Sequence, residues 1–200
     1  MFICAFMGGR IREEGVFLVR WQRVWYLYQV VAGFSGRFLQ WMDGKTGMEK
    51  VTPELQRLIE EIPEMHAALQ IEFADPARLF DMQLGYGVDV TGKDLSGTGK
   101  GEWHPAWVVF GYDYGDPVFV DTREEARGFP VYTAEHGTGN WEPQEIAGTL
   151  AGFIRILLLL NAAMEAGDID YRNLTAKMAP HTGNMDYWDV VIEGIEDNLE

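Results

Sequence analysis

The spacing of apolar residues predicts a helix shortly after Met48. Thr52 suits the N-cap of this helix and Pro53 suits its first position, while Pro63 ends or bends it. Four residues at helical spacing form its apolar face, namely Leu55, Leu58, Ile59 and Ile62. A second, short helix is predicted over residues 76–83.

Short apolar runs between turn residues predict three strands in the middle of the chain. The strands are expected at residues 107–110, 118–120 and 131–133. Turns rich in glycine are expected at residues 115–117, 128–130 and 137–140. Short strands with such tight connections are typical of an antiparallel meander.

Helical periodicity returns in the last third of the chain. Glu142-Pro143 is expected to introduce a helix with an apolar face made of Ile146, Leu150, Phe153, Ile154 and Leu157. Residues 157–160 are apolar all round, which predicts deep burial of that end. The polar run 168–186 is expected to be a loop, and a last helix is predicted over residues 186–199.

The apolar, aromatic segment near the N-terminus suits a helix or a strand. Arg20 and Arg23 interrupt the segment 16–31 and disfavour a membrane-spanning helix, because a central arginine costs about 2.5–3.5 kcal/mol on insertion scales. Glu13 and Glu14 precede it and disfavour a signal peptide. An amphipathic helix lying on a membrane surface remains an alternative.

Charge divides the chain near Met48. Residues 1–47 contain six basic and three acidic residues and so have a net charge of +3. Because the whole chain has a net charge of −15, residues 48–200 have a net charge of −18. Such a field disfavours nucleic-acid binding and attracts a basic partner, although ordinary acidic proteins share it. An alternative interpretation is that translation starts at Met48 and that residues 1–47 are an extension that is not native.

Metal-binding and phosphate-binding patterns are weak in this sequence. The lone Cys4 allows no internal disulfide, and the four histidines lack metal-ligand spacing, so we expect no metal, no cofactor and a cytoplasmic location. The region 85–101 contains six glycines and resembles a phosphate-binding loop only loosely. Asp94 stands where that motif needs glycine, and Gly101 follows Lys100 where it needs serine or threonine.

Acidic side chains near the predicted strands could take part in acid–base chemistry. Such chemistry would need Asp113 or Asp116 beside His104 or His136 in a pocket. Turn roles explain these residues more simply, and Asp121 suits a cap of the next turn. We therefore expect no catalytic residue, and an unrecognised hydrolase stays an alternative.

Aromatic residues crowd around the same strands. Trp107 and Tyr132 are expected in the core, whereas Tyr112, Tyr114 and Trp141 are candidate surface anchors. Aromatic residues next to acids are common at protein interfaces. Together with the neighbouring acids they predict a partner surface made of Tyr112, Asp113, Tyr114, Asp116, Glu124, Glu125 and Trp141.

A turn–strand–turn pattern extends through residues 108–157. It comprises Phe110-Gly111, the run from Gly115 to Asp121 that begins GDP, Pro130-Val131-Tyr132, His136, and Ile146-Ala147 leading to Phe153 and Leu157. This pattern resembles the SUKH superfamily of toxin-immunity and regulatory proteins, over about residues 51–160. The glycine-rich region, the N-terminal 47 residues and the chain beyond Leu160 depart from it.

The resemblance implies an α+β fold with a curved, mostly antiparallel sheet and helices packed around it. It divides the chain into an extension (1–47), a SUKH-like domain (48–165) and a C-terminal tail with a short helix (166–200). It also implies a protein-binding module without a catalytic site, in its specific form an immunity protein that neutralises a basic, nuclease-type toxin domain. A regulatory or scaffolding protein of the same fold is the alternative.

Overall fold

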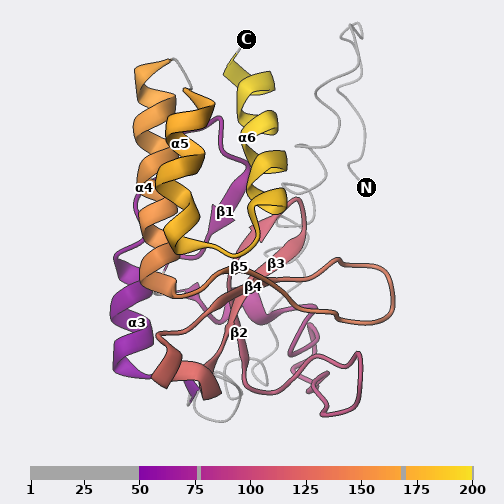
Figure 1. Ribbon diagram of the computed structural model, residues 1–200. Coiled ribbons are helices and arrows are strands. Elements are labelled where there is room, and N and C mark those ends of the chain that lie inside the picture. Colours follow the sequence, from indigo (N-terminus) through magenta and orange to yellow (C-terminus); the bar gives the residue numbers. More distant parts are fainter. Residues whose placement is uncertain (1–49, 76–77, 168–169, 200) are drawn as a thin grey trace, which may run out of the picture. The chain divides into compact units, whose positions relative to one another are not determined.

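Five antiparallel strands cross the sheet in the order in which they occur in the chain (Figure 1). The computed structural model describes residues 50–75, 78–167 and 170–199, which all belong to one compact unit. The strands are β1 (Ile71–Phe73), β2 (Trp107–Asp113), β3 (Asp116–Asp121), β4 (Val131–Thr133) and β5 (Gln144–Ala147). Every neighbouring pair is antiparallel and the sheet is open, so the predicted α+β class is confirmed.

In the described part of the chain, four α-helices and three short 3₁₀ helices accompany the sheet. The α-helices are α3 (Pro53–Glu60), α4 (Leu150–Ala166), α5 (Tyr171–Met178) and α6 (Met185–Leu199). The 3₁₀ helices are η3 (Asp81–Gln83), η4 (Thr122–Arg127) and η5 (Ala179–His181). Thr52 caps α3 through its side chain and Pro53 begins the helix, as predicted. No helix in the described part of the chain is long and apolar enough to cross a membrane.

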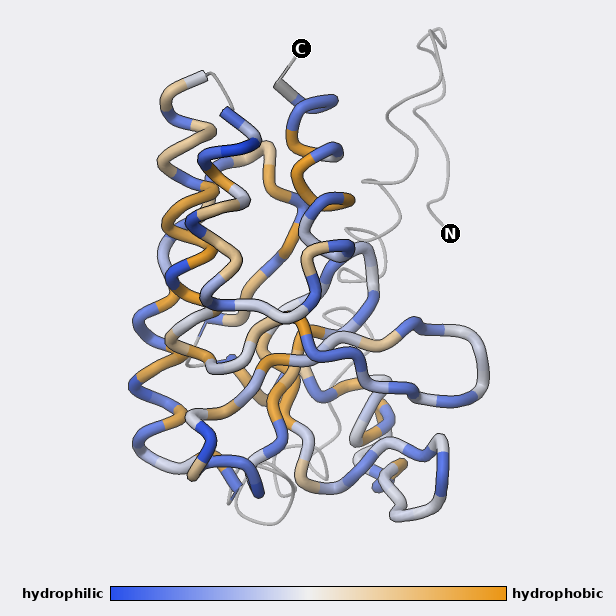
Figure 2. Tube along the Cα trace, viewed as in Figure 1, coloured by the Kyte–Doolittle hydropathy of each residue, from blue (hydrophilic) through white to orange (hydrophobic). Residues whose placement is uncertain are grey.

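The main hydrophobic core lies between one face of the sheet and all four helices. Alternate residues of the central strands, such as Val108, Phe110, Val118 and Val120, enter this core. Figure 2 shows the hydrophobic residues gathered in the sheet and α4, while the long connections are mainly hydrophilic. Trp188 of α6 is fully buried there and completes the core.

A smaller, aromatic core covers the opposite face of the sheet. It consists of the buried Trp103, Val109, Phe119 and Ala134, against which several half-buried aromatic residues pack. The Trp103 ring lies 5.0 Å from the Phe119 ring. The half-buried members are Met82, Tyr86, Trp107, Tyr112, Tyr132 and Trp141. Trp107 and Tyr132 therefore contact a core, although neither is fully buried.

The prediction that a helix begins directly after Glu142-Pro143 is wrong. Residues 144–147 form the edge strand β5, and the helix α4 begins only at Leu150, after the N-cap Thr149. Ile146 belongs to the strand, where it is fully buried and lies at the register shift between β4 and β5. Its apolar side chain fits both a helical period and a strand facing a core, so spacing alone chose the wrong element.

Three further expectations differ from the structure. Leu158 is 43% exposed, so the apolar end of α4 is not buried all round. The run 168–186, expected to be a loop, contains α5, whose Leu174 and Met178 are buried four residues apart. In the described part of 76–83, only residues 81–83 form a named helix, which is 3₁₀. The predictions for 1–47, including the segment 16–31 and a start at Met48, concern residues outside those described.

Candidate functional site

The turn between β2 and β3 presents an exposed tyrosine on an unusual backbone. Tyr114 and Gly115 link the strands and have φ values of 49° and 95°, the positive values that a type I′ hairpin turn requires. Asparagine and glycine favour such positions, whereas a left-handed conformation costs other residues about 1–2 kcal/mol. Tyr114 is 69% exposed, so its ring gains no burial in compensation. Backbone strain of this kind is concentrated at functional sites.

Asp113, just before the turn, is joined to α6. The Tyr187 hydroxyl donates a hydrogen bond of 2.9 Å to the Asp113 carboxylate. Burial raises the pKa of Asp113, the bond from Tyr187 opposes this, and the nearby Asp116 raises it further. Burial and the neighbouring Asp113 also raise the pKa of Tyr187. This contact fixes one side of the turn.

The other side of the turn is held by two loops. The Tyr86 hydroxyl donates a 2.7 Å hydrogen bond to the carbonyl of Gly115, and burial raises the pKa of Tyr86 to about 12. Asp116 accepts a 2.8 Å bond from the backbone amide of His136 and lies 2.6 Å from His136 Nδ1. The turn is therefore ordered before any partner arrives, which lowers the entropic cost of binding.

Four of the seven predicted surface residues meet at this turn. Asp113, Tyr114 and Asp116 surround it, and Tyr112 lies beside them on β2. Tyr112 is half-buried in the aromatic core and donates a 2.8 Å bond to the carbonyl of Met82, so it is not an exposed anchor. We call Asp113, Tyr114, Gly115 and Asp116 the hairpin site.

The remaining predicted residues lie elsewhere. Glu124 and Glu125 belong to η4, which follows the far end of β3, and Glu125 lies near α3 because Thr52 Oγ1 donates a 3.4 Å bond to it. Trp141 is half-buried, with its ring 5.2 Å from that of Trp103. The predicted set is therefore not one continuous surface.

Pairing distinguishes the acids at the two ends of β3. Glu124 forms a 2.5 Å ion pair with Arg127, and Asp121 likewise contacts Arg123. In the described part of the chain, neither Asp113 nor Asp116 forms an ion pair with lysine or arginine. The negative charge at the hairpin site is consequently less compensated than the charge at η4.

The hydrolase alternative required a histidine beside one of these acids in a pocket, and His136 meets only the first part of that condition. The side chains of His136 and Asp116 are 57% and 35% exposed, so the pair lies open to solvent. His104 makes a different contact, because its Nδ1 accepts a 3.0 Å bond from the amide of Ala106. The described residues contain no group of three or more potential metal ligands.

In the glycine-rich region, a carboxylate of the protein itself occupies a backbone amide that a bound anion would need as a hydrogen-bond donor. Glu102 accepts a 2.7 Å hydrogen bond from the backbone amide of Gly99. An amide that already binds a carboxylate does not offer the positive environment that phosphate requires. This geometry agrees with the poor match of residues 97–101 to a phosphate-binding loop.

Two residues that contact the hairpin site, Tyr86 and Tyr187, were not expected from the sequence, whereas His136 was considered only for the hydrolase alternative. Tyr86, His136 and Tyr187 come from three separate segments and meet the turn only in the folded chain. A tyrosine before glycine in a two-residue turn was the one local signal for the site itself. Comparisons with family models, curated proteins and solved structures found no match to this chain. Its class therefore rests on the fold and the hairpin site.

Proposed function

We propose that the protein is a non-enzymatic, acidic protein-binding module that uses the hairpin site to bind a cationic partner. In the specific form suggested by the SUKH resemblance, it is a cytoplasmic immunity protein that neutralises a basic toxin domain. The observation that carries the proposal is the exposed, strained Tyr114 held between two acids that form no ion pair with a described lysine or arginine. An exposed aromatic ring flanked by acids is suited to binding a basic protein surface.

Each part of the site contributes differently to binding. A rigid aromatic side chain can bury a large area in a partner pocket, which slows dissociation. Asp113 and Asp116 provide negative charge at the rim, which mainly accelerates encounter with a basic surface. Residues 48–200 carry −18, because the whole chain has −15 and residues 1–47 have +3, so long-range attraction acts in the same direction.

Co-expression tests this function in the host. A toxin encoded beside the gene should stop growth, and the wild-type protein should restore it. Combined Tyr114→Ala and Asp116→Asn should abolish rescue without loss of folding, since Tyr114 is exposed and asparagine keeps an oxygen that can accept the bond from the His136 amide. Val190→Ala is the matched control, because Val190 is 68% exposed on α6 and lies outside the site.

Two outcomes would contradict the proposal. Failure of the wild-type protein to restore growth would remove the immunity role for that toxin. Full rescue by the folded double variant would remove the hairpin site even if immunity held. Binding of a regulatory partner with no toxin activity, weakened by the same double variant, would instead support the scaffolding alternative.

A specific observation favours hydrolysis as the second candidate, namely the contact of His136 with Asp116 at 2.6 Å. A histidine oriented by a carboxylate is a common general base. Hydrolysis of ester or phosphoester substrates that His136→Ala abolishes would support an enzyme. The exposure of both side chains makes binding the better supported function, since catalysis gains from exclusion of water.

A further inference from the structure

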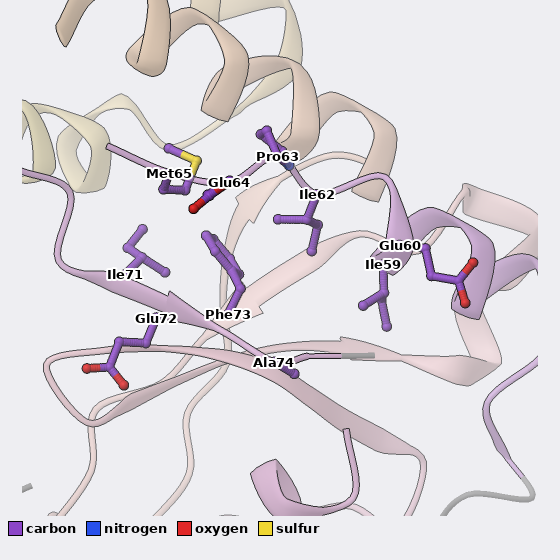
Figure 3. A pocket seen from close by; sticks show the side chains of 10 residues that line it. All are labelled: Ile59, Glu60, Ile62, Pro63, Glu64, Met65, Ile71, Glu72, Phe73 and Ala74. Carbon is purple, nitrogen blue, oxygen red and sulfur yellow. The ribbon is translucent and has the colours of Figure 1, made fainter. Parts of the chain in front are cut away.

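A groove of about 560 Å³ lies at the edge of the sheet, between β1 and the segment that follows α3 (Figure 3). Ile62 and Met65 form one apolar wall, and Ile71 and Phe73 of β1 form the other. In Figure 3 the side chains of Ile62, Met65 and Phe73 point into the same space. The groove is therefore an apolar slot that runs along an edge strand.

The backbone of β1 is available on the groove side. β1 is the first strand of the sheet, and β2 is its only strand neighbour among the described residues. The amide of Ala74 donates a 2.9 Å bond to the carbonyl of Phe110, which belongs to β2. Because backbone groups alternate in direction along an antiparallel strand, those of Ile71 and Phe73 point to the open edge.

The rim of the groove is acidic throughout. Glu60, Glu64 and Glu72 line it, and no lysine or arginine does. None of the three glutamates forms an ion pair with a described lysine or arginine. Figure 3 shows Glu72 directed away from the apolar side chains. An occupant with basic side chains would thus find acceptors around an apolar centre.

We propose that this groove binds an extended segment of a partner protein in which apolar residues alternate with lysine or arginine. The segment pairs with β1 as an added strand. Alternation places its apolar side chains in the groove and its basic side chains toward the glutamates. A second copy of the same edge is a poor occupant, because it would bring Glu72 close to another Glu72.

The groove goes beyond the hairpin site but lies next to it. Ile71 is the register partner of Asp113, so the edge of β1 begins where the hairpin site ends. One partner could occupy both surfaces, yet neither needs the other. Binding of an isolated peptide to the groove can therefore be measured without the partner of the hairpin site.

Fluorescence anisotropy with a labelled nonapeptide of alternating valine and lysine tests the groove. The combined variant Glu60→Gln, Glu64→Gln and Glu72→Gln should weaken binding about tenfold, as expected for the loss of three exposed ion pairs. The matched control replaces Glu165, Glu193 and Glu196 by glutamine, which gives the same net charge and should leave binding within about twofold. Tyr114→Ala should retain full affinity.

Amide exchange and a modified peptide test the strand pairing. Bound peptide should slow exchange at the amides of Ile71 and Phe73, and methylation of the peptide nitrogens along one edge should abolish binding. Equal weakening by both triple variants, or equal affinity for a peptide with its lysines and valines in separate blocks, would overturn the proposal in favour of general charge attraction. Absence of binding, or protection confined to the hairpin site, would overturn it as well.

Discussion

Tyr114 places a bulky ring on a backbone that favours asparagine or glycine. Its φ of 49° and its exposure of 69% mean that neither backbone preference nor burial explains its presence. By contrast, Phe129 also has a positive φ, of 56°, but is only 1% exposed and gains a place in the core. Binding to a partner is therefore the simplest explanation for a tyrosine at position 114.

Replacement of Tyr114 by asparagine should stabilise the protein while it removes the proposed anchor. We expect the free energy of unfolding in urea to rise by about 1 kcal/mol, because asparagine tolerates a left-handed backbone. Leu95→Asn is the control, since Leu95 is 42% exposed and its φ is not positive. A loss of stability in Tyr114→Asn would show that the tyrosine ring makes contacts that stabilise the fold.

Thr133 carries a buried hydroxyl without a partner among the described residues. Thr133→Val keeps the shape of the side chain and removes this polar atom, so unfolding should require about 1 kcal/mol more free energy. Thr133→Ser, which keeps the hydroxyl and loses the methyl group, should destabilise the protein. Chemical denaturation of all three proteins measures the difference, and a destabilised valine variant would reveal a hidden partner for the hydroxyl.

Asp113 should make stability depend on pH in an unusual direction. Burial raises its pKa above 3.8, so the folded state holds this proton more tightly and loses stability as pH rises through the interval from 3.8 to the folded pKa. Asp113→Asn cannot ionise and can still accept the Tyr187 bond. The free energy of unfolding of Asp113→Asn, compared with that of wild type, should therefore be higher at about pH 7 than at about pH 3.

Asp121 provides the opposite case as a control. Burial opposes its ionisation, but hydrogen bonds from Arg123 and Trp107 bring its pKa below 3.8. It contributes stability above that value, which is lost as pH falls through the folded pKa. Asp121→Asn should thus be destabilised at neutral pH and approach wild type in acid. Parallel pH profiles for the two variants would contradict both assignments.

At the scale of elements, local signals predicted the first helix through its capping residue and the central strands through short apolar runs between turn residues. Thr52-Pro53 marked α3, and the runs at 107–110, 118–120 and 131–133 marked the three central strands. The edge strands β1 and β5 were missed, because neither is a run of β-branched and aromatic residues between turn residues, as the equally short β4 is. Their pairing partners lie 42 and 16 positions away in the register pairs Ile71–Asp113 and Val131–Ala147, so no local window contains the cause.

The start of α4 depends on one threonine. Thr149 Oγ1 accepts a 2.9 Å bond from the amide of Gly152 and so satisfies a free donor of the first turn. Thr149→Val should lower the free energy of unfolding by about 1 kcal/mol, whereas Thr149→Ser should be nearly neutral. Thermal or urea unfolding checks both variants. A larger loss in Thr149→Ser than in Thr149→Val would show that the methyl group, which lies beside Gly128, matters more than the cap.

At the scale of the whole molecule, the last 35 residues complete the main core. The region 166–200, expected as a tail, supplies the buried Leu174, Met178, Trp188, Ile192 and Ile195. Trp188 Nε1 donates a 2.8 Å bond to the carbonyl of Ile146, which ties α6 to the edge strand β5. The sheet and the C-terminal helices therefore share one core and should unfold together.

Trp188→Phe tests this cooperative role. The smaller ring leaves a cavity and an unpaired buried carbonyl, so the unfolding free energy should fall by about 2–4 kcal/mol. Tyr171→Phe is the control, because it also removes one aromatic hydrogen bond, of 2.7 Å to Asp189, but at an exposed position. Coincident unfolding by circular dichroism and tryptophan fluorescence would support one core, and a separate early transition of the C-terminal helices would contradict it.

The α+β class, the three central strands, the first helix and the acidic character could all be predicted from the sequence. These features follow from neighbouring residues, through short apolar runs, capping and net charge. The edge strands, the role of α5 and α6 in the core, and the contacts that order Tyr114 emerge only in the folded chain. Those features depend on Tyr86, His136 and Tyr187 meeting one turn from distant segments. Long-range contacts set them, because burial and hydrogen-bond partners exist only once the chain has folded.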